Sequence, residues 1–279
     1  MYVAPDAPEA LNLLHQNNIA CFRTPESCAE SVKTFLNTKN PVKPIIFKND
    51  LSDISKKLEK NIFKNLSEDE ALEIFKDIGI EIVNYKVSSN EKQAIEYSIQ
   101  IGFPLAMKVL SSEIMHKTET GGVELNIKNL EEVKISFKKL SDIFQKLKIN
   151  SSEKKFIIQK MEKGIAEIIL GYRVDELVGP IVVIGSGGIL SEIYNDKSIR
   201  MAPVDITEAK KMIKEVKSLV TITGYRGLPE VDINIIATAI VNISKFALVK
   251  EIKEAEINPV IVKKNNEGIV AVDGLITLK

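Results

Sequence analysis

The sequence has little of several features that would indicate a function at once. Among its 279 residues are two cysteines and two histidines, and the net charge is zero because 38 basic residues balance 38 acidic ones. This balance excludes an overall electrostatic field that would attract nucleic acid or an anionic membrane. Cys21 and Cys28 are too far apart for a CxxC site, and His15 completes no metal-binding pattern with them. Partners must therefore be recognised through local sites.

Long hydrophobic runs are also missing. The longest uncharged stretch, near residues 177–191, is shorter than the roughly 20 residues that a membrane-spanning helix needs, and it contains Gly and Pro. The first ten residues have neither the basic nor the apolar region of a secretory signal. We therefore expect a cytoplasmic protein. With 44% hydrophobic residues, the chain can bury the core of one large domain, or of one domain with an appendage.

From residue 66 onward the pattern indicates an α/β (α+β) fold. A capping box over residues 67–70 begins the first helix of this region, and Gly79 ends it. Further helices are expected over residues 88–102, 129–147, 207–217 and 232–247. Strands are expected over residues 80–87, 104–109, 122–127, 156–161, 165–174, 180–184, 251–262 and 268–278. Runs of strands with separate helices favour sheets flanked by helices over a strict βαβ alternation.

The first 45 residues follow a different pattern. Helices over residues 7–17 and 25–36 and a strand over 19–22 are too few to close a core. We interpret residues 1–45 as the end of a domain whose body is absent. A linker rich in Pro, Lys, Ser and Asn is expected over residues 46–65, and the main domain over residues 66–279.

Candidate metal ligands lie on the last predicted hairpin. The proline after Asn258 favours an extended backbone, so Glu254, Glu256 and Asn258 should share one strand face. A turn over residues 264–267 would place Asn258 opposite Asp273. Asn258, Asp273 and Glu256 could then hold Mg²⁺ together with phosphate oxygens. The spacing alone leaves open a solvated polar face on an edge hairpin, although the apolar flanks of both strands favour burial.

Two further features suggest a phosphate site. Lys108 lies in an apolar strand, where an inward ammonium group needs an anion such as a nucleotide phosphate. A lysine on the solvent face of an edge strand is the alternative. The glycine cluster at residues 185–188 follows another apolar strand, as a phosphate cradle would, but it matches neither GxGxxG nor GxxxxGK[ST].

The second histidine lies in a polar loop between two apolar strands. A neutral imidazole at His116 can accept a phosphoryl group on a ring nitrogen and release it again. Lys117 and the backbone N–H groups around Gly121 and Gly122 would help to neutralise the transferred charge. A surface histidine without a chemical role is the alternative, and no single one of these signals decides between them.

Taken together and in order, these motifs resemble the ATP-grasp β part of the ADP-forming acyl-CoA (acetyl-CoA) synthetases, in the succinyl-CoA ligase superfamily. The matching segments are GFPLAMKV, HKTETGGV, IIQKMEKGIAEIILG, GPIVVIGSGGILSEIYNDKSIRMAP, GYRG, EAEINPVIV and AVDGLI. Residues 1–36 are similar to the closing segment of the CoA-ligase-like (flavodoxin-like) domain that precedes ATP-grasp in fused members of the family.

The resemblance implies a two-lobed ATP-grasp fold that binds ATP or ADP with Mg²⁺. Lys108 would contact the nucleotide phosphates, and the cleft between the lobes would be lined by Gln159, Met161 and Glu167. The phosphate loops would include Gly187 and Gly188, besides the residues that follow the histidine.

The resemblance also implies a reaction. His116 would take a phosphoryl group from a histidine of the α part and carry it to ADP, so that acyl-CoA, ADP and phosphate give the acid, ATP and CoA. A CoA-binding α subunit or domain would be required. Two alternatives are a nucleotide-sensing module of an acetyltransferase-like regulator and an ATP-grasp ligase that forms an acyl phosphate directly. The intact histidine loop favours the ligase with a phosphohistidine, and a chain end directly after the last strand leaves no room for an acetyltransferase domain.

Overall fold

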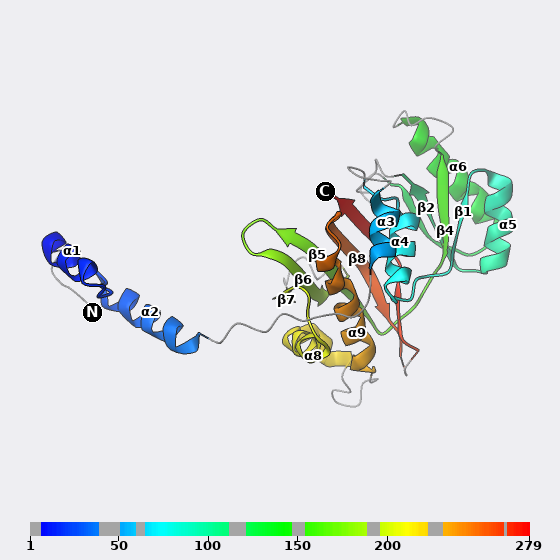
Figure 1. The fold of residues 1–279 in the computed structure, drawn as a ribbon. Helices are drawn as coiled ribbons and strands as arrows, with labels where there is room; N and C mark the ends of the chain where they lie inside the picture. The colour runs from blue at the N-terminus through cyan, green and yellow to red at the C-terminus, as the bar shows by residue number, and fades with distance from the viewer. Residues whose placement is uncertain are drawn as a thin grey trace. The chain divides into compact units, whose positions relative to one another are not determined.

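The computed structural model describes residues 7–38, 51–59, 65–111, 121–146, 154–188, 196–222, 231–264 and 267–279. The chain divides into two compact units, Met1–Ile46 and Phe47–Lys279. Figure 1 shows the elements of both. None of the described helices is both long and apolar enough to cross a membrane.

The first unit contains two helices, α1 (Pro8–Gln16) and α2 (Pro25–Asn37). Both have proline in the first turn, where its fixed φ suits a helix and its missing N–H costs nothing. The strand expected over residues 19–22 is wrong, because the described residues show only an isolated bridge at Phe22. In α2 no residue is buried, and Phe35 and Leu36 are 80% and 75% exposed. The apolar side of α2 thus lacks a covering layer within the described part of its unit.

The second unit begins earlier than the sequence suggests. Helix α3 (Ser52–Leu58) falls inside the segment expected to be a linker, and its Ile54 and Leu58 are buried in the main hydrophobic core. The linker prediction for residues 46–65 is therefore wrong over this helix. Two buried residues at a spacing of four are a weak helical signal, and the surrounding Lys, Ser and Asp conceal it.

The first sheet of this unit has the strand order β1-β4-β2-β3, and all its neighbours are antiparallel. Its strands are β1 (Tyr85–Ser88), β2 (Leu105–Leu110), β3 (Val123–Ile127) and β4 (Lys155–Lys160). Helices α5 (Glu91–Ile101) and α6 (Leu130–Lys146) share a hydrophobic core with one face of this sheet. The aromatic residues of α6 belong to this core, since the ring of Phe144 packs on that of Phe156.

One detail of β3 departs from the expected alternation. Residues 123, 125 and 127 should share a face, but Leu125 is 61% exposed. The pairing of β3 with β2 shifts between Leu105 and Met107, and Asn126 has a positive φ of 60°. Such a bulge turns the following side chains to the other face.

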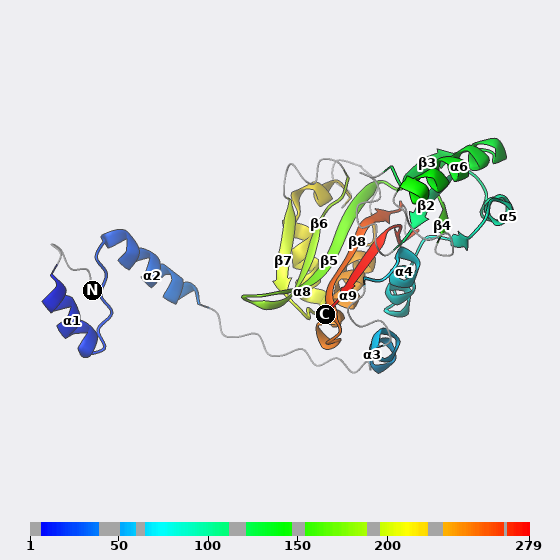
Figure 2. The same ribbon diagram turned by 90° about the horizontal axis from the view of Figure 1, so that it is seen from above.

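The second sheet has the strand order β10-β8-β5-β6-β7, and β9 also pairs with β8. Its strands are β5 (Ala166–Asp175), β6 (Gly179–Ser186), β7 (Lys197–Met201), β8 (Ile252–Val262), β9 (Ile269–Ala271) and β10 (Gly274–Leu278). Helices α4 (Glu68–Asp77), α8 (Ile206–Glu215) and α9 (Ile233–Ser244) pack against this sheet. Figure 2 shows the strands side by side with α8 and α9 on one face.

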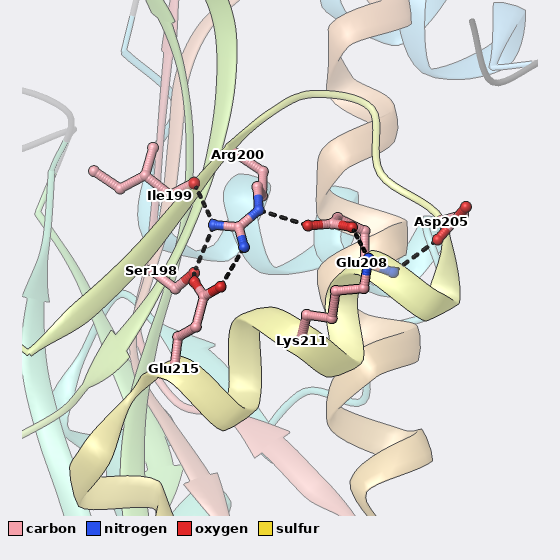
Figure 3. A network of polar contacts seen from close by, with 7 residues as sticks. All are labelled: Ser198, Ile199, Arg200, Asp205, Glu208, Lys211 and Glu215. Carbon is pink, nitrogen blue, oxygen red and sulfur yellow. Dashed lines mark hydrogen bonds and ion pairs between the residues drawn. The ribbon is translucent and has the colours of Figure 1, made fainter. Parts of the chain in front are cut away.

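Strand β7 is not expected from the sequence, because its five residues are mostly polar. Polar contacts with α8 hold it at the sheet edge (Figure 3). The guanidinium of Arg200 donates from Nε to Glu208 Oε1 at 2.7 Å and from Nη1 to Ser198 Oγ at 3.2 Å, and its Nη2 pairs with Glu215. Side-chain hydrogen bonds to Glu215 and Glu208 raise the pKa of Arg200, and its hydrogen bond lowers that of Glu215. The polar contacts of Arg200 thus stabilise a strand that lacks the alternating apolar residues by which strands are usually predicted.

Candidate functional site

Lys108 occupies the centre of the first sheet. Every residue of β2 is buried, and Lys108 itself is 5% exposed, so the alternative of a solvent-facing edge lysine is wrong. Its neighbours Met107 and Val109 pack in the core with α5 and α6. Because side chains alternate along a strand, Lys108 points to the opposite face. That face carries the candidate site.

Two carboxylates surround the Lys108 ammonium group. Lys108 Nζ lies 2.8 Å from Glu68 Oε1 and 3.0 Å from Asp273 Oδ2. Burial lowers the pKa of Lys108, but the two carboxylates outweigh burial and raise it above its ordinary value. Lys108 is therefore a fixed cation, which is what the expected role at phosphates would require. The anions that the structure places beside it are carboxylates of its own chain.

Gln159 lies on the adjacent strand β4 and joins the same group. It is fully buried, and its Nε2 donates to Glu68 Oε1 at 3.0 Å and to the carbonyl oxygen of Val272 at 3.1 Å. Its Oε1 is buried without a hydrogen-bond partner among the described residues. A buried acceptor without a donor costs about 1–3 kcal/mol, so this atom is suited to accept a hydrogen bond from a bound molecule.

Glu68 is the member that the sequence did not reveal. It belongs to the first turn of α4, where three consecutive acidic residues are unremarkable because they favour the positive end of the helix dipole. The expected capping box is confirmed, but it uses Ser67 and Glu70. Glu68 instead makes contacts across 40 and 91 residues of sequence, to Lys108 and Gln159. Local spacing carries no signal for contacts of that range.

The close packing of α4 on β10 brings Glu68 near Asp273. A β-carbon at Gly274 would lie 2.7 Å from the Phe75 ring of α4, so only glycine allows this approach. Asp273 and Val272 form the break between β9 and β10. The site therefore draws on α4, on the first sheet and on the hairpin of the second sheet.

The predicted register of the last hairpin is confirmed. The backbone N–H of Lys263 donates to Gly268 at 3.0 Å, and that of Asn258 donates to the carbonyl oxygen of Asp273 at 3.1 Å. Asn258 and Asp273 are therefore cross-strand neighbours, as a four-residue turn requires. The second arm differs from the expected continuous strand in being interrupted at Asp273, whose carboxylate reaches Lys108.

The three expected metal ligands form an oxygen-rich group. Asn258 Nδ2 lies 3.3 Å from Glu256 Oε1. Burial raises the pKa of Glu256, and the charges of Glu254 and Asp273 raise it further, while the hydrogen bond from Asn258 opposes this. The described residues contain no cluster of three or more His, Cys, Asp or Glu side chains arranged to hold a metal. Two carboxylates and an amide oxygen suit Mg²⁺, with phosphate or water oxygens completing its shell.

The glycine cluster lies against Glu167 on β5. The N–H of Gly187 donates to the carbonyl oxygen of Glu167 at 2.7 Å, and a β-carbon at Gly187 would lie 2.8 Å from the Glu167 carbonyl carbon. Gly188 has a φ of 81°, and its β-carbon would lie 3.5 Å from Glu167 Oε2. Met161 follows β4 and donates its N–H to Pro104. The structure thus brings Glu167 and both glycines together, whereas the hydrogen bond of Met161 joins it to the residue before β2.

The histidine loop adjoins the strand that carries Lys108. His116 and Lys117 fall within residues 112–120, which lie outside the described residues. After them, Gly121 has a φ of 71°, a conformation that glycine adopts readily, and the carbonyl oxygen of Gly122 accepts from the N–H of Val109. Both ends of the loop are therefore anchored at β2.

Comparisons with known proteins agree with this geometry. A family model described as an ATP-grasp domain matches residues 57–278. The β subunit of acetate–CoA ligase [ADP-forming] I of Pyrococcus furiosus is 38% identical over 214 residues, which cover 76% of this chain and 91% of that subunit. The 4-hydroxybutyrate–CoA ligase [ADP-forming] of Nitrosopumilus maritimus is 34% identical over 215 residues, which cover 77% of this chain but 31% of that protein.

A solved structure is similar over the same region. It is acetyl-coenzyme A synthetase 1 of Ca. Korarchaeum cryptofilum in complex with coenzyme A and Mg-AMPPCP, described with its phosphohistidine segment pointing towards the nucleotide binding site. It has a TM-score of 0.67 and 32% identity, and the match covers 81% of this chain and 99% of that one.

Proposed function

The chain belongs to the ATP-grasp β family of the ADP-forming acyl-CoA synthetases, and from this premise we propose that it is the nucleotide-binding and phosphotransfer part of such an enzyme. The family resemblance inferred from the motifs is thereby confirmed. The reaction is the reversible conversion of acyl-CoA, ADP and phosphate to the free acid, ATP and CoA.

The observation that carries the proposal is the group Glu68, Lys108, Gln159 and Asp273. It places a buried, fixed cation beside a carboxylate at the edge of an oxygen-rich set, on the strand that precedes His116 in the sequence. Phosphoryl transfer depends mainly on positioning and on neutralising charge, and this group offers both. A cation next to carboxylates is the expected environment for a phosphate accompanied by a metal.

Each residue then has a role. Lys108 binds phosphate oxygens, and Asn258, Asp273 and Glu256 hold Mg²⁺, which when bound neutralises further phosphate charge. A ring nitrogen of His116 attacks the terminal phosphorus of ATP, so that an N–P bond forms while the bond to the ADP oxygen breaks. In the opposite direction ADP takes the phosphoryl group from His116. The phosphohistidine segment of the similar Korarchaeum structure supports this role.

The nucleotide cleft is proposed to include Gln159, Met161 and Glu167. Gln159 offers an unpaired buried acceptor, and Glu167 lies against Gly187 and Gly188. Lys117, Gly121 and Gly122 would supply charge and N–H groups beside His116. These roles follow the family resemblance residue by residue.

The full reaction is proposed to require a CoA-binding α part. A relative of matching length is a β subunit, whereas a longer relative contains the matched part as about a third of its chain. Residues 1–46 precede the matched family region, and we retain the proposal that they correspond to the end of a CoA-ligase-like domain. The exposed apolar side of α2 supports this, because such a segment would normally be covered. A cytoplasmic location is proposed, since ATP and CoA esters are used there.

The direct test is reconstitution. The chain is mixed with the α subunit of a two-subunit relative, and ATP formation is measured from acetyl-CoA, ADP and phosphate. We expect a rate that needs both chains and that His116→Ala abolishes. The absence of a rate with any short acyl-CoA would contradict the proposed function.

The two alternatives differ in their need for the histidine. A nucleotide-sensing module would bind ATP without forming a phosphoprotein, and a ligase that forms an acyl phosphate directly would be indifferent to His116→Ala. The comparisons support the acyl-CoA ligase over both.

A further inference from the structure

Glu68 has no role in the proposed chemistry, although it is one of the most deeply buried members of the site. Its side chain is 1% exposed, at the start of α4. One oxygen, Oε1, accepts from Lys108 Nζ at 2.8 Å and from Gln159 Nε2 at 3.0 Å. A buried carboxylate costs several kcal/mol unless it is paired and hydrogen-bonded, and here two donors meet that need.

The two donors are also the groups that reach the hairpin of the second sheet. Lys108 Nζ extends to Asp273 Oδ2 at 3.0 Å, and Gln159 Nε2 extends to the carbonyl oxygen of Val272 at 3.1 Å. Both thus connect Glu68 to adjacent residues of the break between β9 and β10. Glu68 thus holds the same two donor groups that contact the hairpin.

Lys108 is shared by two carboxylates in different environments. The side chain of Glu68 is 1% exposed and that of Asp273 is 38% exposed, while that of Lys108 is 6% exposed. The charge of Asp273 also acts on Glu256, on the side of the expected metal. If Asp273 turned its oxygens to a cation, Lys108 would depend on Glu68 for a counter-charge, because water is excluded from it.

We propose that Glu68 is a positioning residue of the phosphate site, which anchors Lys108 and Gln159 so that Asp273 remains available to Mg²⁺. This inference rests on the proposed function, because it assumes that Asp273 binds the metal. Without Glu68, Lys108 has Asp273 as its remaining carboxylate in the described structure, and the metal must compete with the lysine for it.

The test compares Glu68→Gln with Glu70→Gln in the full chain. Both changes remove one carboxylate from the first turn of α4, but Glu70 is exposed and accepts from the N–H of Ser67 at 2.9 Å. Binding of ADP is measured by calorimetry over a range of Mg²⁺ concentrations. We expect Glu68→Gln to raise the half-saturating Mg²⁺ concentration about tenfold or more, the size of effect typical for residues that orient metal ligands, and Glu70→Gln to leave it within about twofold.

A further variant, Glu68→Asp, keeps the result interpretable. Glu68→Asp retains the charge, so its half-saturating Mg²⁺ concentration should lie between those of wild type and Glu68→Gln. If Glu68→Gln does not fold, a half-saturating Mg²⁺ concentration of Glu68→Asp equal to that of wild type overturns the inference. A folded Glu68→Gln protein with wild-type Mg²⁺ dependence also overturns it, since a purely structural role would lower only the unfolding temperature.

Asp273→Asn separates this inference from the proposed function. If Asp273→Asn raises the Mg²⁺ requirement and Glu68→Gln does not, only the role of Glu68 fails. If Asp273→Asn itself has no effect, the metal assignment in the proposed function fails, and the inference about Glu68 fails with it.

Discussion

Replacing Lys108 with methionine removes the cation but keeps most of the volume of the side chain. Glu68, 1% exposed, then remains buried with the Gln159 amide as its donor among the contacts described above. Removing one partner of a buried ion pair costs about 3–5 kcal/mol. Asp273 is 38% exposed and can be solvated, so loss of its ion pair with Lys108 should add less than about 1 kcal/mol to the destabilisation. We therefore expect Lys108→Met to lower the free energy of unfolding by about 3–5 kcal/mol.

A double-mutant cycle shows whether this cost arises from Glu68. Urea unfolding is followed by circular dichroism, because the chain has no tryptophan for fluorescence. In Lys108→Met/Glu68→Gln both charges of the buried pair are removed, so the double variant should be more stable than the sum of the single losses predicts, by about 1–3 kcal/mol. Additivity to within about 0.5 kcal/mol would refute the view that Lys108 and Glu68 form one coupled unit.

Three other predictions concern the phosphate loop, the β7 edge and the first unit. Gly187→Ala should weaken ADP binding and destabilise the fold by about 1–3 kcal/mol, because its β-carbon would lie 2.8 Å from a backbone carbon of β5, whereas Gly171→Ala on that strand meets nothing closer than 3.9 Å and should bind ADP normally. Arg200→Ala should lower the free energy of unfolding by about 1–2 kcal/mol at pH 7. Because Arg200 lowers the pKa of Glu215, this ion pair stabilises the fold above the ordinary glutamate pKa of about 4.3, and the stabilisation is lost as the pH falls below it. The difference in unfolding free energy between wild type and Arg200→Ala should therefore narrow in acid, and a difference that does not narrow would contradict this. Phe35→Asp should weaken association with an α subunit, measured by sedimentation, without changing ADP affinity, and an unchanged association would argue against α2 as a contact surface.

Much of the main domain could be predicted because its signals are local. The helices from residue 66 onward have apolar periodicity and caps, and the register of the last hairpin follows from counting outward from its turn. Lys108 was recognisable as an anomaly, since an ammonium group in an apolar strand needs an anion nearby. The carboxylates of Glu68 and Asp273 could not be recognised as that anion. They are far from Lys108 in the sequence and meet it only in the folded chain.

The features that were missed depend on contacts rather than on pattern. Strand β7 is held by the ion pairs of Arg200 with α8 instead of by an apolar face. Helix α3 has a short apolar side within a polar segment, so the sequence pattern does not predict it. The structure identifies it because Ile54 and Leu58 are buried in the main core. Glu68 has the same local context as its acidic neighbours in the first turn of α4, and differs from them in its burial and in its long-range contacts.

The most direct measurement for the central claim is transfer of label from [γ-³²P]ATP to the protein with Mg²⁺. We expect an acid-labile, base-stable phosphohistidine from which ADP removes the phosphoryl group as labelled ATP. This phosphohistidine should be absent from His116→Ala, although this variant still binds ADP. Label that persists in His116→Ala, or no label on a wild-type chain that binds Mg-ATP, would contradict the phosphohistidine relay.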